Sequence, residues 1–224
     1  QDVCNQFKRL PLANLEDLKL GLFLFAIGLI KKVYFADTFG EWVDNAHDEY
    51  NDLDFWRAWT ATLSYTLQIY FDFSGYADMA LGLALCFGVK LPLNFNSPYQ
   101  AHNIQDFWRT WHITLGRFLR DYIYIPLGGN RKGFLPMLLF TVLTFFIGGL
   151  WHGAGWTFVI WGLLHGVALI IFHLTTNQAF KLPKLLSWCI TFVFVHITWV
   201  FFRSENLDIA LTILGKMTSY YATV

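Results

Sequence analysis

The chain has 224 residues, of which 55% are hydrophobic, 19% are aromatic and only 14% are charged, a balance more apolar than that of an ordinary soluble domain. Sixteen basic residues offset sixteen acidic ones, so no net positive field exists to hold a nucleic acid backbone, and nucleic-acid-binding classes are excluded. Residence in a lipid bilayer is the economical interpretation.

The first long apolar run covers residues 18–37 and is interrupted only near its end, by Lys31 and Lys32. Long cationic side chains can reach the membrane surface from such a position, so the run predicts one membrane-spanning helix. The following residues 41–54 are polar and acidic, with several turn formers. They predict a solvent-facing loop.

Residues 55–89 are apolar but too long for one crossing, and they carry Asp72, Gly75 and Asp78 in their middle. This pattern predicts either two helices that meet near Gly75 or one broken helix. Carboxylates inside a membrane protein usually have a partner. For Asp72 and Asp78 we expect ion pairs with a cation from a set of three arginines, namely Arg109, Arg117 and Arg120.

The rest of the chain alternates irregular and apolar segments. Residues 90–103 are rich in Asn, Pro and Ser and predict irregular structure, while residues 104–125 predict an amphipathic helix that lies at the interface or re-enters the membrane. Residues 127–134 predict a basic, cytoplasmic loop. Three further spans are expected at residues 135–150, 156–174 and 185–202, with a second basic connection at Lys181, Pro183 and Lys184. The amphipathic tail from residue 203 is left unassigned.

His152 is the strongest candidate for chemistry, because it follows a long apolar run within the motif GGLWHGAGW. An ionisable group at mid-membrane costs roughly 2.5–3.5 kcal/mol, so such groups usually face a protein interior or a wet cavity. Its glycine neighbours leave room for a substrate or another backbone. An imidazole can take up and return a proton at neutral pH. The alternative is a histidine that only bonds a neighbouring helix, and both readings stay open.

A second Trp-His centre occupies residues 106–112, with the sequence DFWRTWH. Helical spacing predicts that Trp108, Arg109 and His112 share one face. The motif fits a second catalytic imidazole or an interfacial aromatic belt, and by itself it favours the belt. The surroundings of His165 indicate helix packing. The sequence contains no Gly-rich phosphate loop, HExxH pair or Gly-x-Ser-x-Gly elbow, and its three scattered cysteines lack metal-site spacing, so no metal is expected.

These motifs resemble a known family. DFWRTWHITLGRFLRDYIYIPLGGNRKG followed by GGLWHGAGWTFVIWGLLHG is similar to the membrane-bound O-acyltransferase family, as are IGLIKKVYFAD and YFDFSGYADMALGLALCFGVKLPLNFNSPY upstream. The likeness extends from about residue 20 to residue 166. Within the family, the PLGGNR sequence at residues 126–131 resembles the members that acetylate alginate.

The resemblance implies an all-α, multi-pass transmembrane helical bundle, with re-entrant or interfacial amphipathic helices around a tunnel. The chain has no initiator methionine, and family members are longer at the N-terminus. Residues 1–224 are therefore expected to form the central and C-terminal part of a single membrane domain, without its N-terminal helices. The implied location is the bacterial inner membrane.

The resemblance also implies a reaction, the transfer of an acetyl group from a cytoplasmic donor across the membrane toward an exported polysaccharide such as alginate. His152 and His112 match the family's catalytic histidines. The expected substrate contacts are Trp108, Arg109, Trp111, Trp151, Asn130 and Arg131. No bound cofactor is expected, and acetyl-coenzyme A is the candidate co-substrate. The implied partners are the lipid bilayer, a periplasmic acetyltransferase and the exopolysaccharide.

Two other classes remain open at this stage. In a transporter or proton-relay subunit of a polysaccharide export complex, Asp72, Asp78, His152 and His165 would form a relay. A scaffold of such a complex would tolerate loss of both Trp-His histidines.

Overall fold

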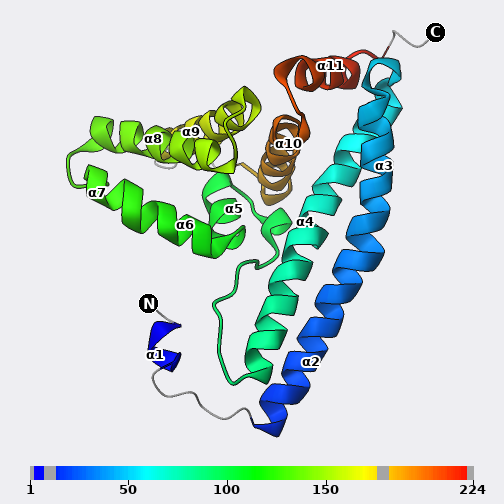
Figure 1. Cartoon of the computed structure of the whole chain (residues 1–224). Coiled ribbons are helices and arrows are strands. Elements are labelled where there is room, and N and C mark those ends of the chain that lie inside the picture. The colour runs from blue at the N-terminus through cyan, green and yellow to red at the C-terminus, as the bar shows by residue number, and fades with distance from the viewer. Residues whose placement is uncertain (1–2, 8–13, 176–181, 221–224) are drawn as a thin grey trace. The chain divides into compact units, whose positions relative to one another are not determined.

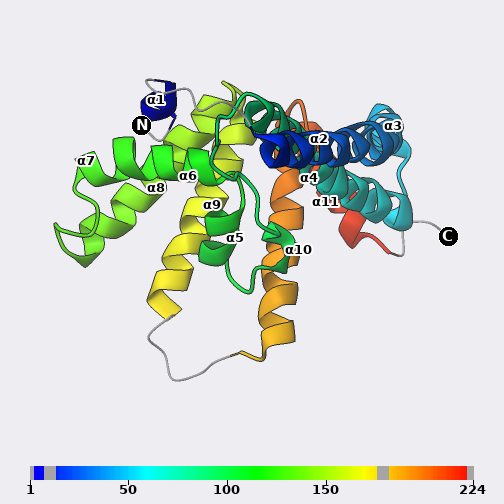
Figure 2. The ribbon, with the colours of Figure 1, turned by 90° about the horizontal axis from the view of Figure 1, so that it is seen from below.

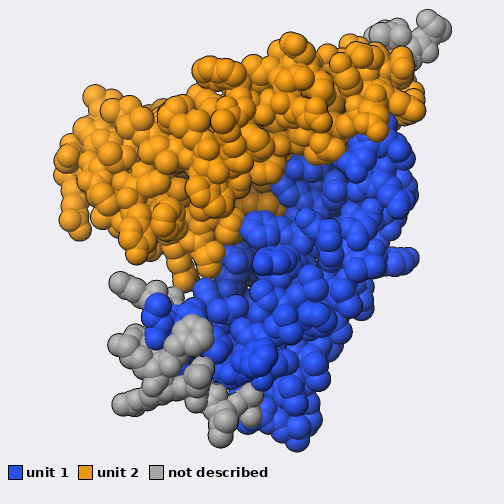
Figure 3. Space-filling view, viewed as in Figure 1, with its two compact units in different colours: residues 1–45, 64–96 blue, residues 46–63, 97–224 orange. Residues whose placement is uncertain are grey.

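The computed structural model describes residues 3–7, 14–175 and 182–220. Every regular element within these ranges is helical (Figure 1), which confirms the predicted all-α class. The chain divides into two compact units, residues 1–45 with 64–96 and residues 46–63 with 97–224 (Figure 3). Helices α3 (Asp37–Asp48) and α4 (Phe55–Cys86) each contribute to both units.

The first unit begins with α1 (Cys4–Phe7) and α2 (Leu15–Ile30). The Asn14 side chain caps α2 by accepting a hydrogen bond from the backbone N–H of Asp17 at 2.7 Å, which satisfies one of the free donors of the first turn. Helix α2 continues through a π-helical turn, η1 (Lys31–Ala36), directly into α3. The predicted helix at residues 18–37 is confirmed. The predicted loop is wrong for residues 41–48, because their polar side chains form the exposed face of an amphipathic helix that buries Gly40 and Val43.

Helix α4 runs without interruption over 32 residues, so the predicted break near Gly75 is wrong. Gly75 and Gly82 serve close packing against α2 instead. A Cβ atom on Gly75 would lie 2.7 Å from the backbone carbonyl oxygen of Gly28, and one on Gly82 would collide with that of Gly21. Small residues at both contact points let the two helix backbones approach each other closely.

Lysines of the π-helical turn neutralise the two carboxylates of α4. The Nζ atom of Lys31 lies 2.6 Å from Asp78, and that of Lys32 lies 2.7 Å from Asp72 and 2.9 Å from Asp37. The predicted pairing with an arginine is therefore wrong, because the packing of α2 on α4 already brings two cations within reach.

The second unit contains the Trp-His centres, and its short helices were not foreseen. Residues 104–125 do not form one helix. The elements of this unit are η2 (Tyr50–Asp52), η3 (Pro98–Gln100), α5 (Ile104–Thr110), α6 (Ile113–Leu119), η4 (Arg120–Tyr124), α7 (Ile125–Leu127), α8 (Phe134–His152), α9 (Trp156–Thr175), α10 (Lys184–Arg203) and α11 (Leu207–Thr218). The irregular segment before α5 and the turn-rich loop after α7 are confirmed.

Three helices in the described part of the chain, α8, α9 and α10, are long and apolar enough to cross a membrane. They confirm the three membrane-spanning helices predicted for the C-terminal part of the chain. Helix α2 does not reach the same length. Helices α8 and α9 lie side by side, and Figure 2 shows α5 between α9 and α10. Of the predicted basic connection, Pro183 and Lys184 introduce α10, and Lys181 lies outside the described residues.

Candidate active site

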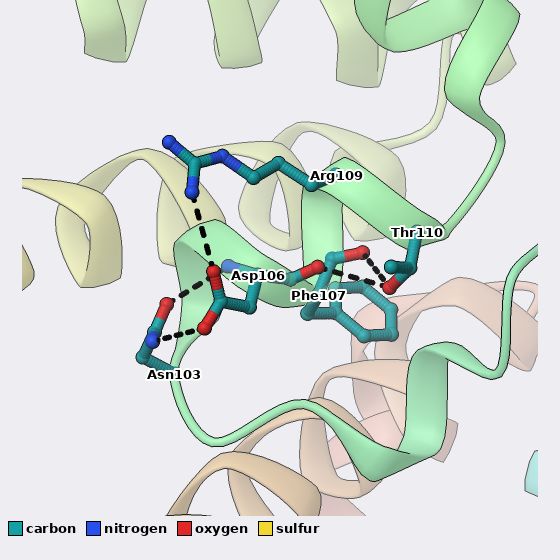
Figure 4. Close-up of polar contacts among 5 residues, drawn as sticks. All are labelled: Asn103, Asp106, Phe107, Arg109 and Thr110. Atoms are coloured by element: carbon teal, nitrogen blue, oxygen red, sulfur yellow. Dashed lines mark hydrogen bonds and ion pairs between the residues drawn. The ribbon is translucent and has the colours of Figure 1, made fainter.

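The second Trp-His centre is a helix break. Asn103 caps α5, its side-chain oxygen accepting a hydrogen bond from the backbone N–H of Asp106 at 2.8 Å, and its amide also bonds the Asp106 carboxylate (Figure 4). At the other end, the Thr110 hydroxyl donates to the carbonyl oxygens of Asp106 and Phe107. His112 then adopts a left-handed backbone with a φ of 42°. Such a conformation costs roughly 1–2 kcal/mol in a non-glycine residue, and it persists only where its surroundings enforce it.

The break separates the side chains that helical spacing would have placed on one face. Arg109 lies on the surface, with 67% of its side chain exposed, and pairs with Asp106 at 3.4 Å (Figure 4). Trp111 turns inward and is only 4% exposed. The prediction that Trp108, Arg109 and His112 share a face is therefore wrong, because the helical register ends at Thr110.

Aromatic rings anchor this broken segment to α9 and α10. The Trp111 ring lies 5.6 Å from the Phe107 ring and 5.0 Å from the Trp199 ring, measured between centroids. Trp108 packs 4.9 Å from Phe145 of α8 and 5.8 Å from Trp161 of α9. Contacts with three long helices hold the segment in place despite its strained backbone.

His152 is the last residue of α8 and is half-buried. Its imidazole has edge-to-face contacts with Trp161 and Phe202, at centroid distances of 5.1 and 5.0 Å, and with Trp151 at 4.9 Å. Trp151 is 61% exposed. The imidazole therefore has aromatic walls on several sides but is not sealed, which leaves it open to a reacting group.

The glycines around His152 bring a neighbouring backbone close. A Cβ atom on Gly149 would collide with the carbonyl oxygen of Phe158, and one on Gly162 with that of Phe145. For Gly149, the structure shows the approach of another backbone, which is one of the two uses that the sequence allowed. Close packing of α8 on α9 fixes the position of His152 relative to Trp161.

The two Trp-His histidines belong to one site. The imidazoles of His112 and His152 are close enough to interact electrostatically. Burial lowers the pKa of His112 to about 4, because removal from water disfavours the charged form. At neutral pH His112 is therefore a neutral imidazole, with one nitrogen that can donate a hydrogen bond and one that can accept one.

His165 and His196 are buried behind this site. His165 bonds the indole of Trp108 and the hydroxyl of Thr198, and His196 bonds the hydroxyl of Thr62 at 3.1 Å. The contacts of His165 agree with the packing role that the sequence indicated for it.

Asn130 and Arg131 lie far from the histidines. They occupy the loop before α8, and both are exposed, whereas His152 ends this helix of 19 residues. At about 1.5 Å per residue, the two ends of α8 are about 28 Å apart. The structure thus brings together His112, His152, Trp108, Trp111 and Trp151, and it leaves Arg109, Asn130 and Arg131 outside.

Trp161 was not singled out from the sequence, although its ring borders His152. Within the described residues, the buried indole N–H groups of Trp161 and Trp199 have no hydrogen-bond partner. An unmet buried donor costs roughly 1–3 kcal/mol, so each requires an explanation. A tryptophan in an apolar helix carries no sequence signal that would distinguish it from a packing residue.

Among the described residues, no group of three or more His, Cys, Asp or Glu side chains could hold a metal ion. An open groove of about 960 Å³ lies between α9 and α10, with His102, Leu164 and Phe194 among its lining residues. Neither His112 nor His152 lines this groove, so it is not the expected tunnel, which stays a prediction.

Comparison with known proteins points to one family. Residues 4–207 match the membrane-bound O-acyltransferase family. The chain is 56% identical to the peptidoglycan O-acetyltransferase of Helicobacter pylori, over 91% of this chain and 40% of that protein. It is 46% identical to the probable alginate O-acetylase AlgI of Pseudomonas aeruginosa, over 98% of this chain and 42% of that protein. A teichoic acid D-alanyltransferase of Bacillus subtilis is 33% identical over 63% of this chain and 40% of that protein. The chain thus spans about two fifths of the length of these relatives.

Proposed function

The chain belongs to the membrane-bound O-acyltransferase family, and on that premise we propose that the full-length protein is an O-acetyltransferase acting on a cell-envelope polysaccharide. In this proposal it is a multi-pass protein of the bacterial inner membrane, and residues 1–224 are the central and C-terminal part of one membrane domain. It takes the acetyl group from a cytoplasmic donor, with acetyl-coenzyme A as the co-substrate, and passes it across the membrane.

The observation that carries this proposal is the half-buried imidazole of His152, which has aromatic rings around it and lies within electrostatic range of His112. His152 acts as general base, taking the proton from the accepting hydroxyl as its oxygen attacks the acyl carbon. Neutral His112 holds the acyl group or donates a hydrogen bond to its carbonyl oxygen.

Trp161 offers a further donor for the developing oxyanion. Its indole N–H is buried beside His152 and has no partner among the described residues. A donor that finds its partner only when the acyl group is bound stabilises the transition state without competing with water. Trp108 and Trp111 support the segment that carries His112, and Trp151 is the exposed contact for substrate.

The acceptor is proposed from the names of the relatives. One is named for peptidoglycan and another for alginate, and both are polysaccharides outside the cytoplasm. The higher identity belongs to the peptidoglycan enzyme, so peptidoglycan joins alginate as a candidate acceptor. A periplasmic acetyltransferase partner remains part of the proposal.

The deciding experiment replaces His152 by Ala in the full-length protein, with His173→Ala as control because His173 lies on α9 outside the site. Acetyl content is then measured on purified peptidoglycan and on exopolysaccharide from a deletion strain that carries each variant. We expect His152→Ala to lose acetylation and His173→Ala to keep it. Acetylation at the parental level in His152→Ala would remove this histidine from the mechanism.

The competing proton relay loses support from the structure. Asp72 and Asp78 each form an ion pair with a lysine, which accounts for both carboxylates without a relay. Acetyl transfer from labelled donor by purified protein, compared with proton flux in sealed vesicles, separates the two functions.

A further inference from the structure

We propose that His165 is a positioning residue, which fixes the indole of Trp108 through a single neutral tautomer and thereby sets the geometry of the His112–His152 pair. This inference rests on the proposed acetyl transfer and adds a role to a residue outside the reacting centre. His165 is completely buried, and both of its ring nitrogens have hydrogen-bond partners within the protein.

The hydrogen bonds around His165 determine its tautomer. Trp108 Nε1–H lies 3.2 Å from His165 Nδ1, and an indole nitrogen can only donate. His165 Nδ1 must therefore be the unprotonated, accepting nitrogen, and the proton of the neutral ring sits on Nε2. That nitrogen lies 3.0 Å from the Thr198 hydroxyl oxygen.

Thr198 extends this series of hydrogen bonds, because its hydroxyl accepts from His165 and donates to the next group. Its hydroxyl donates to the backbone carbonyl of Val195 at 2.7 Å, which leaves its oxygen free to accept the Nε2 proton of His165. Donors and acceptors thus alternate from Trp108 through His165 and Thr198 to the backbone of α10. A proton added to Nδ1 would face the indole N–H, so the arrangement admits only the neutral ring.

Trp108 connects this series of hydrogen bonds to both reacting histidines. Along the sequence it lies four residues before His112, on the short helix that ends in the left-handed break. In space its ring packs 5.8 Å from Trp161, and Trp161 lies 5.1 Å from His152. His165 also contacts Trp161 directly, at 5.1 Å. A shift of the Trp108 indole would therefore move the supports of His112 and His152 together.

The experiment compares His165→Gln with His165→Phe in the full-length enzyme, with kcat and KM for acetyl transfer as readouts. A glutamine amide offers one acceptor and one donor, so it can replace both hydrogen bonds, whereas phenylalanine keeps an aromatic ring and removes both. Misplacement by about 1 Å costs on the order of 100-fold in rate. We expect His165→Phe to lower kcat by about 10- to 100-fold at nearly constant KM. His165→Gln should stay within about threefold of the parent and keep its pH profile.

A double-mutant cycle with Trp108→Phe tests whether the effect runs through the indole. If both substitutions break the same hydrogen bond, the double variant should be no slower than the slower single variant. Fully additive losses would overturn the proposal, as would a His165→Phe enzyme with parental kcat or a His165→Gln enzyme as slow as His165→Phe. Should His165→Phe fail to accumulate, Thr198→Val removes the acceptor of Nε2–H with little change of shape, and parental kcat in that variant would equally overturn the proposal.

Selective ¹⁵N labelling of histidine in the full-length protein tests the tautomer without any enzymatic reaction. We expect His165 to stay protonated at Nε2 only, with no titration between about pH 5 and pH 8. This readout separates the two proposals. A protein without acetyl transfer but with the expected tautomer would refute the proposed function, and an active enzyme with His165 protonated at Nδ1 would refute the positioning role alone.

Discussion

Replacing Gly162 by Ala should impair the site without touching a polar group. The new Cβ atom would lie well within 3.0 Å of the Phe145 carbonyl oxygen, whereas ordinary contacts of this kind begin at 3.4 Å. The obstacle is backbone, so α8 and α9 must separate by about 1 Å to restore an ordinary contact, at a cost of about 1–3 kcal/mol in stability. Trp161, the residue before Gly162, would move relative to His152. Since a displacement of about 1 Å costs on the order of 100-fold in rate, Gly162→Ala should lower kcat by about 100-fold.

Gly215→Ala is the matched control. Gly215 lies inside helix α11, and a Cβ atom there meets nothing within 4 Å. Both substitutions raise helix propensity by a similar amount, roughly 0.5–1 kcal/mol, so only the contact with Phe145 distinguishes them. The assay is acetyl transfer by the full-length variants at matched membrane levels, together with their thermal unfolding midpoints. Equal kcat and equal midpoints in the two variants would refute the close-packing argument.

Three further predictions concern charges and donors. Trp161→Phe should lower kcat by about 100-fold, because it removes an oxyanion donor. Trp188→Phe is the control and should keep kcat, since the Trp188 indole donates to the backbone of Tyr99 instead. Equal losses of kcat in the two variants would contradict the donor role. Lys31→Ala should lower the free energy of unfolding by about 1–3 kcal/mol, since it leaves the partly buried Asp78 carboxylate unpaired, and adding Asp78→Asn should restore most of it. Burial lowers the pKa of His112 to about 4, so this imidazole does not change its charge between about pH 6 and pH 8. The factor by which His112→Gln lowers kcat/KM should therefore be the same across this pH range. A tenfold change of that factor near pH 6.5 would contradict the prediction.

The long C-terminal helices could be predicted from the sequence because their signal is local. Runs of about twenty apolar residues are distinctive, and the structure places α8, α9 and α10 where those runs occur. The all-α class follows from the same signal, since lipid-embedded backbone must satisfy its own hydrogen bonds. Such a run can be recognised without knowing which other segment packs against it.

The predicted helix break at Gly75 was wrong because the role of this glycine depends on a helix that is distant in the sequence. Gly75 reads as a break in isolation, because glycine lowers helix propensity. In the structure its missing side chain makes room for the backbone of Gly28, which lies 47 positions earlier in the sequence. The lysine partners of Asp72 and Asp78 were missed for the same reason, since only the packing of α2 on α4 makes them neighbours.

The geometry of the second Trp-His centre could not be predicted either. The sequence from Phe107 to Ile113 contains neither Gly nor Pro, so nothing in it marks the left-handed residue His112. The strain there is supported by contacts of Trp108 and Trp111 with rings from α9 and α10. The family resemblance singled out His112 as a candidate catalytic residue, but the local structure around it depends on rings from α9 and α10.

The length of α8 constrains how the basic loop can take part in the reaction. Arg131 precedes this helix and His152 ends it, so the two residues lie at opposite ends of a helix about 28 Å long. They can serve one donor molecule only if its anionic group and its acyl carbon lie about that far apart. A compact donor held at His152 would leave Arg131 without a role, and Arg131→Gln would then change neither kcat nor KM. An extended thioester donor predicts a raised KM with unchanged kcat, because the arginine would bind a remote part of the substrate equally in the ground and transition states.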